Sequence, residues 1–213
     1  MTILALLALT ILALAAAWVG WRLRSKRTLM PCPAEFAWLV EMENPLARAT
    51  NSNHVVRELA LPPGARVMDI GCGPGRVTIP LARAVGPHGE VLALDVQAAM
   101  LARVAEKAAT EDLANIRPVH SDVRSASIQK GSLDAAVMVM ALGEVPEGAS
   151  VFPFIVTALK PGGRLLVAES IFDPHFVSRR RLREEAAAAG LVEHAYGGNI
   201  FGYSIVFGKR QVS

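Results

Sequence analysis

A glycine-rich stretch after a short apolar run is the part of this sequence best suited to hold a ligand. It reads Asp69-Ile70-Gly71-Cys72-Gly73-Pro74-Gly75. Glycine lets a ligand approach the backbone closely, and some of these positions should need positive φ. The spacing is GxGxG, whereas the dinucleotide fingerprint is GxGxxG, so the pattern disfavours a pyrophosphate. Taken alone, the three glycines fit tight packing of a strand on a helix equally well.

Carboxylates follow two later apolar runs. Asp95 ends the run 91–95, and Asp122 follows the run 116–120. A carboxylate at a strand end can accept hydrogen bonds from both hydroxyls of a ribose, as expected for Asp95. Asp122 could accept from an exocyclic amine such as adenine N6. Each also has a simpler alternative, an N-cap for Asp95 and a turn residue for Asp122.

Glu144 and His175 are the candidates for contact with a second substrate, because each follows a later strand. His175 can take a proton near neutral pH, and Glu144 can do so if burial raises its pKa. The alternative for Glu144 is a solvated loop acid, and the alternative for His175 is a surface or turn histidine. No metal site is predicted, since Cys32 and Cys72 lie far apart without CxxC or histidine at ligand spacing. Two such cysteines fit a reducing, cytosolic setting best.

The elements that must position these residues alternate from residue 65 onward. Short β-branched runs alternate with alanine-rich stretches, which is typical of βαβ units and a parallel sheet. Strands are predicted at 66–70, 90–95, 116–120, 133–140, 164–169, 191–196 and 204–209. Helices are predicted at 53–60, 76–84, 98–110, 149–159 and 178–189.

The N-terminal segment 3–21 carries no charge and is long enough to cross roughly 30 Å of hydrocarbon as a helix. Trp18 and Trp21 stand at its end, and a basic cluster follows at once, which predicts that the rest of the chain faces the cytoplasm. A cleaved signal peptide or a buried core helix is the alternative, but the basic n-region is missing. We expect a transmembrane anchor at 1–28, a helical lid segment at 29–60 and one domain at 61–213.

Composition limits the other classes of function. With 213 residues, 52% of them hydrophobic, and a net charge of +3, the chain allows one α/β domain and a short appendage. The sequence shows no basic face with interleaved aromatic residues, so nucleic-acid binding is not predicted. A basic run predicts either a helix face with internal ion pairs or contact with anionic headgroups. Its residues are Arg179, Arg180, Arg181 and Arg183, beside Glu184 and Glu185.

Together these residues resemble the class I methyltransferases that depend on S-adenosylmethionine. The resemblance also rests on Leu133-Asp134 and on Leu159-Lys160-Pro161-Gly162-Gly163-Arg164-Leu165. It implies a Rossmann-like, doubly wound, mainly parallel sheet of seven strands whose last strand is antiparallel. The glycine turn would hold the methionine part of the cofactor, Asp95 its ribose, and Asp122 with Val123 its adenine. The predicted cofactor contacts are Asp69, Gly71, Cys72, Gly73, Gly75, Asp95, Val96, Gln97, Asp122, Val123 and Met140.

Within that class, the sequence is most similar to the methyltransferases of ubiquinone and menaquinone synthesis and their small-molecule relatives. The anchored layout also resembles short thiol and lipid methyltransferases, so a small amphiphilic acceptor at the membrane is expected. No Asn-Pro-Pro-Tyr tetrapeptide follows the fourth strand, which argues against nucleobase amines. Two alternatives stay open: a non-catalytic scaffold that binds S-adenosylmethionine at the membrane, and an NAD(P)-dependent oxidoreductase.

Overall fold

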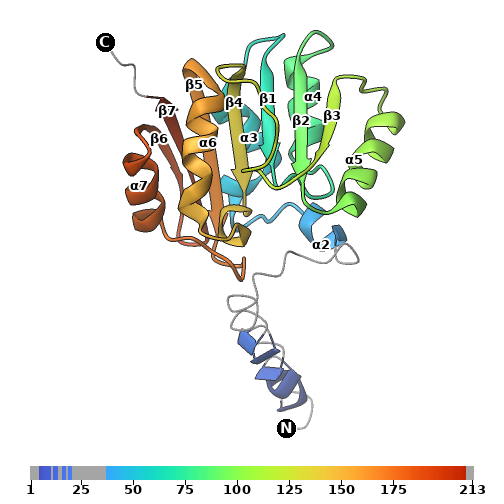
Figure 1. Ribbon diagram of the computed structural model, residues 1–213. Coiled ribbons are helices and arrows are strands. Elements are labelled where there is room, and N and C mark those ends of the chain that lie inside the picture. The colour runs from blue at the N-terminus through green and yellow to red at the C-terminus, as the bar shows by residue number, and fades with distance from the viewer. Residues whose placement is uncertain (1–4, 11, 14–15, 18, 21–36, 210–213) are drawn as a thin grey trace.

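The computed structural model describes residues 5–10, 12–13, 16–17, 19–20 and 37–209 (Figure 1). The described residues before position 21 are helical. Across the described ranges, no helix combines the length and the apolar composition needed to cross a membrane. Much of the predicted anchor at 1–28, and the first part of the predicted lid at 29–60, lie outside the described residues.

A seven-stranded sheet forms the centre of the domain and confirms the sheet of the predicted fold class, but the described residues do not show the transmembrane helix expected before it. Its order is β3-β2-β1-β4-β5-β7-β6. All neighbouring pairs are parallel except those of β7, which runs antiparallel to both β5 and β6. The strands are β1 (Arg66–Ile70), β2 (Glu90–Asp95), β3 (Ile116–His120), β4 (Leu133–Val139), β5 (Leu159–Ser170), β6 (Leu191–Gly198) and β7 (Gly202–Lys209).

Helices cover both faces of the sheet, which explains why the central strand β4 is almost wholly apolar. One face packs against α6 (Val151–Ala158) and α7 (Arg179–Ala188). The opposite face packs against α3 (Ser52–Leu59), α4 (Thr78–Val85) and α5 (Ala98–Thr110). Figure 1 shows α6 and α7 in front of the sheet and α3 and α4 behind it. Loops at the carboxyl ends of the strands are therefore left to form a site.

The largest difference from the sequence prediction is in β5. The sequence pattern predicts a start at residue 164 after a turn, but the strand begins at Leu159. Leu159 pairs with Leu133 and Arg164 pairs with Ala135, so residues 160–163 bulge out of the ladder. Lys160 Nζ lies 2.7 Å from Asp134 Oδ1 and holds this bulge against β4. The predicted turn is thus part of the strand.

Smaller differences affect element ends. Helix α4 begins at Thr78 rather than at residue 76, and β4 ends at Val139 rather than at residue 140. Strands β6 and β7 each extend two residues further toward their shared turn than predicted. Short elements lie at the carboxyl edge of the sheet: α2 (Ala37–Glu41), η2 (Arg48–Thr50), η3 (Leu142–Glu144) and η4 (Gly148–Ser150).

Strand β3 is one edge of the sheet and contains Pro118. The amide of Val91 donates to Asn115 O, and the amide of Ser121 donates to Asp95 O. The backbone N–H and C=O groups of the odd-numbered residues of β3 therefore point toward β2. The backbone nitrogen of Pro118 points away from the sheet. Proline is tolerated there because it lacks only a donor that β2 would not have used.

Candidate cofactor site

The glycine-rich turn joins β1 to α4 and has three glycines at positive φ: Gly71 (+67°), Gly73 (+51°) and Gly75 (+88°). A Cβ at Gly71 would lie 2.6 Å from Ala141 Cβ, and one at Gly75 would lie 3.1 Å from Val104 Cγ2. These two glycines allow tight packing. A Cβ at Gly73 would have Val40 Cγ1 as its nearest neighbour, at 3.8 Å, so this position leaves room beside the backbone.

Asp95 ties the turn to the end of β2. Its Oδ2 accepts from the Gly73 amide at 2.9 Å, and its Oδ1 accepts from the Gln97 amide at 2.8 Å. The side chain is nearly buried, and this burial raises its pKa. Gln97, not Asp95, is the N-cap of α5, so the N-cap alternative is wrong. The carboxylate still has acceptor capacity for a ligand hydroxyl, because each oxygen carries two lone pairs.

Asp69 lies beneath the turn, at 2% exposure. Its Oδ2 accepts from the Thr78 hydroxyl at 2.6 Å. Burial raises the pKa of this carboxyl to about 6, against the lowering effect of the Thr78 hydrogen bond. Cys72 is a buried free thiol whose pKa is raised by burial and by Asp69. Asp69 is thus an acid that titrates just below neutral pH next to the turn.

The strand order reverses between β1 and β4, where open α/β sheets bind ligands. Met140, the first residue after β4, has φ +53°, a conformation that costs ~1–3 kcal/mol outside glycine. Its amide donates to Ala168 O at 2.8 Å, which holds the strained residue beside β5. Strain of this kind gathers at binding sites. Met140 lies between Val139, which lines a small cavity at the glycine turn, and Ala141, which lies close to Gly71.

Asp122 lies at the same edge of the sheet but is already paired. Arg124 Nη2 donates to its Oδ2 at 2.8 Å, and Arg124 Nε donates to its Oδ1 at 2.9 Å. These hydrogen bonds lower the pKa of Asp122. Val123 is buried in the core, while Val96, beside Asp95, is 52% exposed. An adenine at this edge would therefore meet the exposed Val96 and would have to share Asp122 with Arg124.

A segment of the predicted lid covers the glycine turn. Glu43, just after α2, accepts from Arg76 Nη1 at 3.0 Å, and the same nitrogen donates to Thr50 O at 2.8 Å. Val40 of α2 lines a cavity of about 20 Å³. The remaining lining residues are Asp69, Gly71, Cys72, Arg76, Val77 and Val139. This cavity is far smaller than the ~300–1,000 Å³ of a typical small-molecule site.

Arg76 is a site residue that the sequence pattern did not single out. It opens the stretch that follows the turn, and its side chain is 8% exposed. Its Nε is buried and has no hydrogen-bond partner in the described part of the chain. A buried unpaired guanidinium nitrogen is costly, so it marks a place where an anion would be stabilised. The signal available in the sequence was an arginine directly after the glycine turn.

The structure brings Glu144 and His175 to neighbouring segments. Glu144 ends η3, and a Cβ at the preceding Gly143 would lie 1.9 Å from His175 O. The His175 amide donates to Asp173 Oδ1 at 2.6 Å. His175 is only 7% exposed, so it is not a surface histidine, but it does lie in a turn, which is the other half of that alternative. Glu144 is half-buried, not a fully solvated loop acid.

Glu169, near the end of β5, is a buried acid beside these two segments. Its Oε2 accepts from the Val177 amide at 3.2 Å, while its Oε1 has no partner among the described residues. Burial, then the nearby Asp173 carboxylate, raises its pKa well above the usual value. Tyr203, its cross-strand neighbour, donates to Val177 O at 2.7 Å. Both side chains thus fix Val177 and the loop that carries His175.

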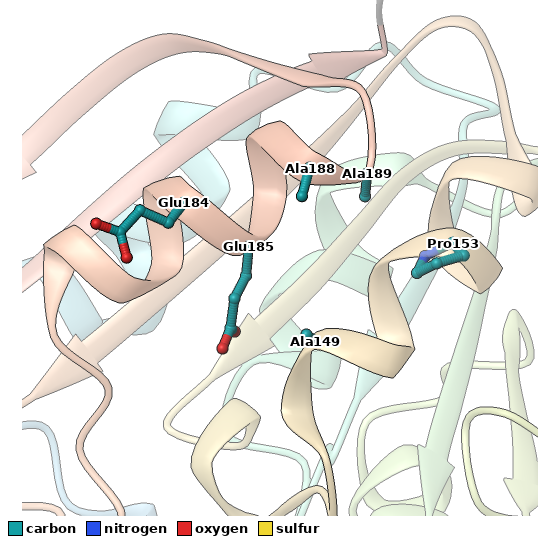
Figure 2. A pocket seen from close by; sticks show the side chains of 6 residues that line it. All are labelled: Ala149, Pro153, Glu184, Glu185, Ala188 and Ala189. Atoms are coloured by element: carbon teal, nitrogen blue, oxygen red, sulfur yellow. The ribbon is translucent and has the colours of Figure 1, made fainter.

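The larger hollow, of about 360 Å³, lies between α6 and α7 instead of beside the glycine turn. Figure 2 shows Pro153 and Ala149 from the α6 side facing Ala188 and Ala189 from the α7 side. The acids of this hollow are paired along α7: Arg181 Nε donates to Glu185 at 2.6 Å, and Arg180 Nη1 donates to Glu184 at 3.3 Å. The predicted internal ion pairs of the basic run are present. No cluster of three His, Cys, Asp or Glu side chains suited to a metal occurs in the described ranges.

Comparison with known proteins shows which proteins this chain resembles. Residues 67–163 match the model of a family described as a methyltransferase domain. The chain is 33% identical over 117 residues to a demethylmenaquinone methyltransferase of Staphylococcus haemolyticus, covering 55% of this chain and 48% of that protein. It is 29% identical over 141 residues to an uncharacterized transposon protein of Streptomyces fradiae, covering 66% and 40%. The chain thus spans about half the length of the curated relatives that it matches.

The fold also has close counterparts among solved structures. A SAM-dependent methyltransferase from Aquifex aeolicus superimposes with a TM-score of 0.74 at 19% identity, over 84% of this chain and 99% of that one. A TehB-like SAM-dependent methyltransferase from Corynebacterium glutamicum gives a TM-score of 0.62 at 19% identity, over 92% and 100%. These likenesses show a shared fold.

Proposed function

We propose that this chain, which carries a methyltransferase domain of the class dependent on S-adenosylmethionine, is an enzyme that methylates a small amphiphilic acceptor. The observation that carries the proposal is the contact between Asp95 and the Gly73 amide. It joins a carboxylate suited to bind ribose hydroxyls, at the end of β2, to the glycine-rich turn at the end of β1. The two features lie where this fold binds its ligands.

The residues present fit the cofactor. Gly73 leaves room beside the backbone, and Asp95 retains lone pairs for the ribose hydroxyls. The buried Arg76 Nε, which has no partner in the described residues, would hold the methionine carboxylate. Asp69 and Asp95 supply negative charge near a cationic ligand. Val96, exposed beside Asp95, would pack on the adenine.

S-adenosylmethionine supplies an activated methyl group, so the protein has mainly to align the acceptor and exclude water. The loop after β5 and η3 would form the wall for the acceptor, because Gly143 and His175 pack closely there. In this proposal, Glu144 or His175 would take a proton from the acceptor. A carboxyl or imidazole can do this near neutral pH when its environment tunes its pKa.

The acceptor class is inferred from relatives and from the N-terminal sequence. Demethylmenaquinone methyltransferases are similar to this chain over about half their length, which favours a quinone precursor, lipid or hydrophobic thiol. The uncharged segment 3–21, followed by a basic cluster, favours action at the cytoplasmic face of a membrane. This placement is part of the proposal.

Calorimetric titration of the full chain with S-adenosylmethionine, S-adenosylhomocysteine and NADH tests the cofactor. We expect binding of the first two and none of NADH, since the turn has the GxGxG spacing. Binding of NADH alone would support an oxidoreductase instead.

Transfer is tested by incubating the protein with methyl-labelled S-adenosylmethionine and a membrane extract. A labelled product in the lipid fraction is expected, and Glu144→Gln and His175→Ala variants report whether either side chain takes part. Tight cofactor binding with no labelled product in any fraction would favour the scaffold alternative and overturn the enzymatic proposal.

A further inference from the structure

Large exposed apolar side chains between residues 37 and 209 are concentrated at one edge of the domain. Two of them, Val192 and Tyr196, lie on β6, away from this edge. The others stand on α2, in the segment after it, or in turns at the carboxyl end of the sheet. They are Trp38 (57% exposed), Met42 (62%), Leu46 (50%), Val96 (52%), Phe172 (41%) and Ile200 (79%).

Direct contacts join three of the segments that carry these side chains. The rings of Phe172 and Phe201 stack with centroids 5.8 Å apart, which links the loop after β5 to the β6–β7 turn. In the same turn, Asn199 Nδ2 donates to Leu46 O at 2.8 Å. The turn reaches this edge because Gly202 pairs with Ser170 at the end of β5. Leu46, Phe172 and Ile200 thus belong to one continuous surface.

Helix α2 extends this surface over the cofactor site. Val40 lines the cavity beside the glycine turn, whereas Trp38 and Met42 are exposed. Ion pairs hold the helix in place, between Lys107 Nζ and Glu41 at 2.9 Å and between Arg76 and Glu43. Figure 1 shows α2 and the turns after β5 and β6 at the same end of the sheet. Val96 belongs to the cofactor site, so we define the apolar rim as Trp38, Met42, Leu46, Phe172 and Ile200.

We infer that the apolar rim is a membrane-docking surface that inserts into the outer part of a lipid bilayer. This inference rests on the proposed function and deepens it, because it orients the acceptor site toward the lipid. Exposed apolar side chains grouped on one face mark an interaction surface, and tryptophan favours the membrane interface. Phe172 of the rim lies in the loop that carries His175, and His175 packs against Gly143 of η3, so an acceptor dissolved in the bilayer would reach the site without crossing water.

The chain itself points to a bilayer as the occupant. The N-terminal segment joins the domain through α2, which is part of the rim. In the described part of that segment, large side chains are also exposed: Leu6 (64%), Leu7 (55%), Leu9 (63%) and Leu12 (65%). Transfer of such exposed apolar side chains from water into apolar surroundings is favourable. A bilayer would cover both the segment and the rim at once.

Tryptophan fluorescence in the full chain tests the docking surface, since the sequence holds three tryptophans. Trp18→Phe with Trp21→Phe leaves Trp38 alone. In that same double variant, adding Trp38→Phe and Ile200→Trp leaves a single tryptophan, in the β6–β7 turn. The matched control is Trp38→Phe with Val192→Trp, because Val192 is exposed and apolar but pairs with Gly208 near the opposite edge. Each variant is placed in phosphatidylcholine vesicles with and without brominated acyl chains.

Interfacial side chains lie ~5–10 Å below the headgroups, so brominated chains should remove about half of the emission at positions 38 and 200. Emission at position 192 should stay unchanged. Equal, weak quenching at all three positions would overturn the docking surface. A spectral shift without vesicles that grows with protein concentration would also overturn it and assign the rim to a second copy of the chain. Cofactor titration of the same samples separates the two claims: intact binding without quenching rejects the surface alone, and quenching without cofactor binding rejects the proposed function alone.

Discussion

Asp95 is the side chain on which cofactor binding should depend most. It holds the Gly73 amide and the Gln97 amide and would also receive the ribose. Replacing it with alanine removes charge-assisted hydrogen bonds worth ~1.5–3 kcal/mol each, so we expect the Kd for S-adenosylmethionine to rise by about tenfold or more. Calorimetry with the cofactor and with S-adenosylhomocysteine measures this loss.

Asp122→Ala provides the comparison. Its carboxylate is engaged by Arg124, so breaking that pair should weaken cofactor binding less than Asp95→Ala does. An equal or larger loss for Asp122→Ala would mean that adenine displaces Arg124 and that Asp122 is the main determinant of affinity.

Asp69 should make cofactor affinity depend on pH. Burial raises its pKa to about 6. The ionised carboxylate favours a cationic sulfonium, so binding should be strongest above this pKa and should weaken by up to about tenfold per pH unit below it. Asp69→Asn should bind more weakly near neutral pH and show a flatter pH profile. Titrations from pH 5 to roughly pH 8 make the comparison, and parallel profiles for the two proteins would contradict this role.

The surroundings of a single residue could be predicted from the sequence where its partners follow from the order of the strands, and not where they lie in distant loops. The meeting of Asp95 with the glycine turn was expected, because parallel strands end at the same edge. The burial of His175 was not, since it depends on contact with Gly143, in a loop after another strand. Arg76 was missed because Glu43 and Thr50, which hold it, lie in a segment without a recognisable motif.

In the β1–α4 turn, Gly71 and Gly73 make a matched pair for mutation. Both have positive φ, so alanine at either should cost ~1–2 kcal/mol through strain alone. Gly71→Ala would also push a methyl group against Ala141 and should cost a further ~1–3 kcal/mol. Thermal or urea unfolding of the two variants measures the difference. Gly73→Ala should remain folded but bind the cofactor more weakly; equal stability of the two variants would contradict the packing argument.

Element boundaries followed the sequence wherever local pattern decided them. β1, β2, β3 and α5 have the predicted bounds. The apolar run of β1 ends at Gly71, that of β2 ends at Asp95, and α5 ends before Glu111. β5 did not, because its first residues pair with β4 through a bulge fixed by Lys160 and Asp134. A contact between residues that far apart leaves no periodic signal, and the Pro161-Gly162 step favours a turn locally.

The folded domain as a whole should lose stability as pH rises, through Glu169. The raised pKa means that the native state retains a proton that the unfolded chain releases near pH ~4.3. Its contribution is therefore fully present below that pH and declines toward the native pKa, by up to ~1.4 kcal/mol per pH unit. Glu169→Gln stays neutral, so its unfolding free energy relative to the parent should grow with pH.

Urea unfolding of both proteins between pH 5 and roughly pH 9 measures this difference. Tyr203→Phe serves as the control, because it removes a contact to the same Val177 without an acid in this range. A constant gap between Glu169→Gln and the parent across pH would show that the carboxyl is ionised in the folded state.

Pro118 has a consequence for the protein in crowded surroundings. The outer edge of β3 would otherwise present a full row of amides to any neighbouring strand, and molecules gathered on one surface meet often. A proline whose nitrogen faces outward interrupts that row, so edge-to-edge growth into intermolecular sheets is blocked at this end. A high local density of molecules would then concentrate catalytic capacity without seeding aggregates from β3.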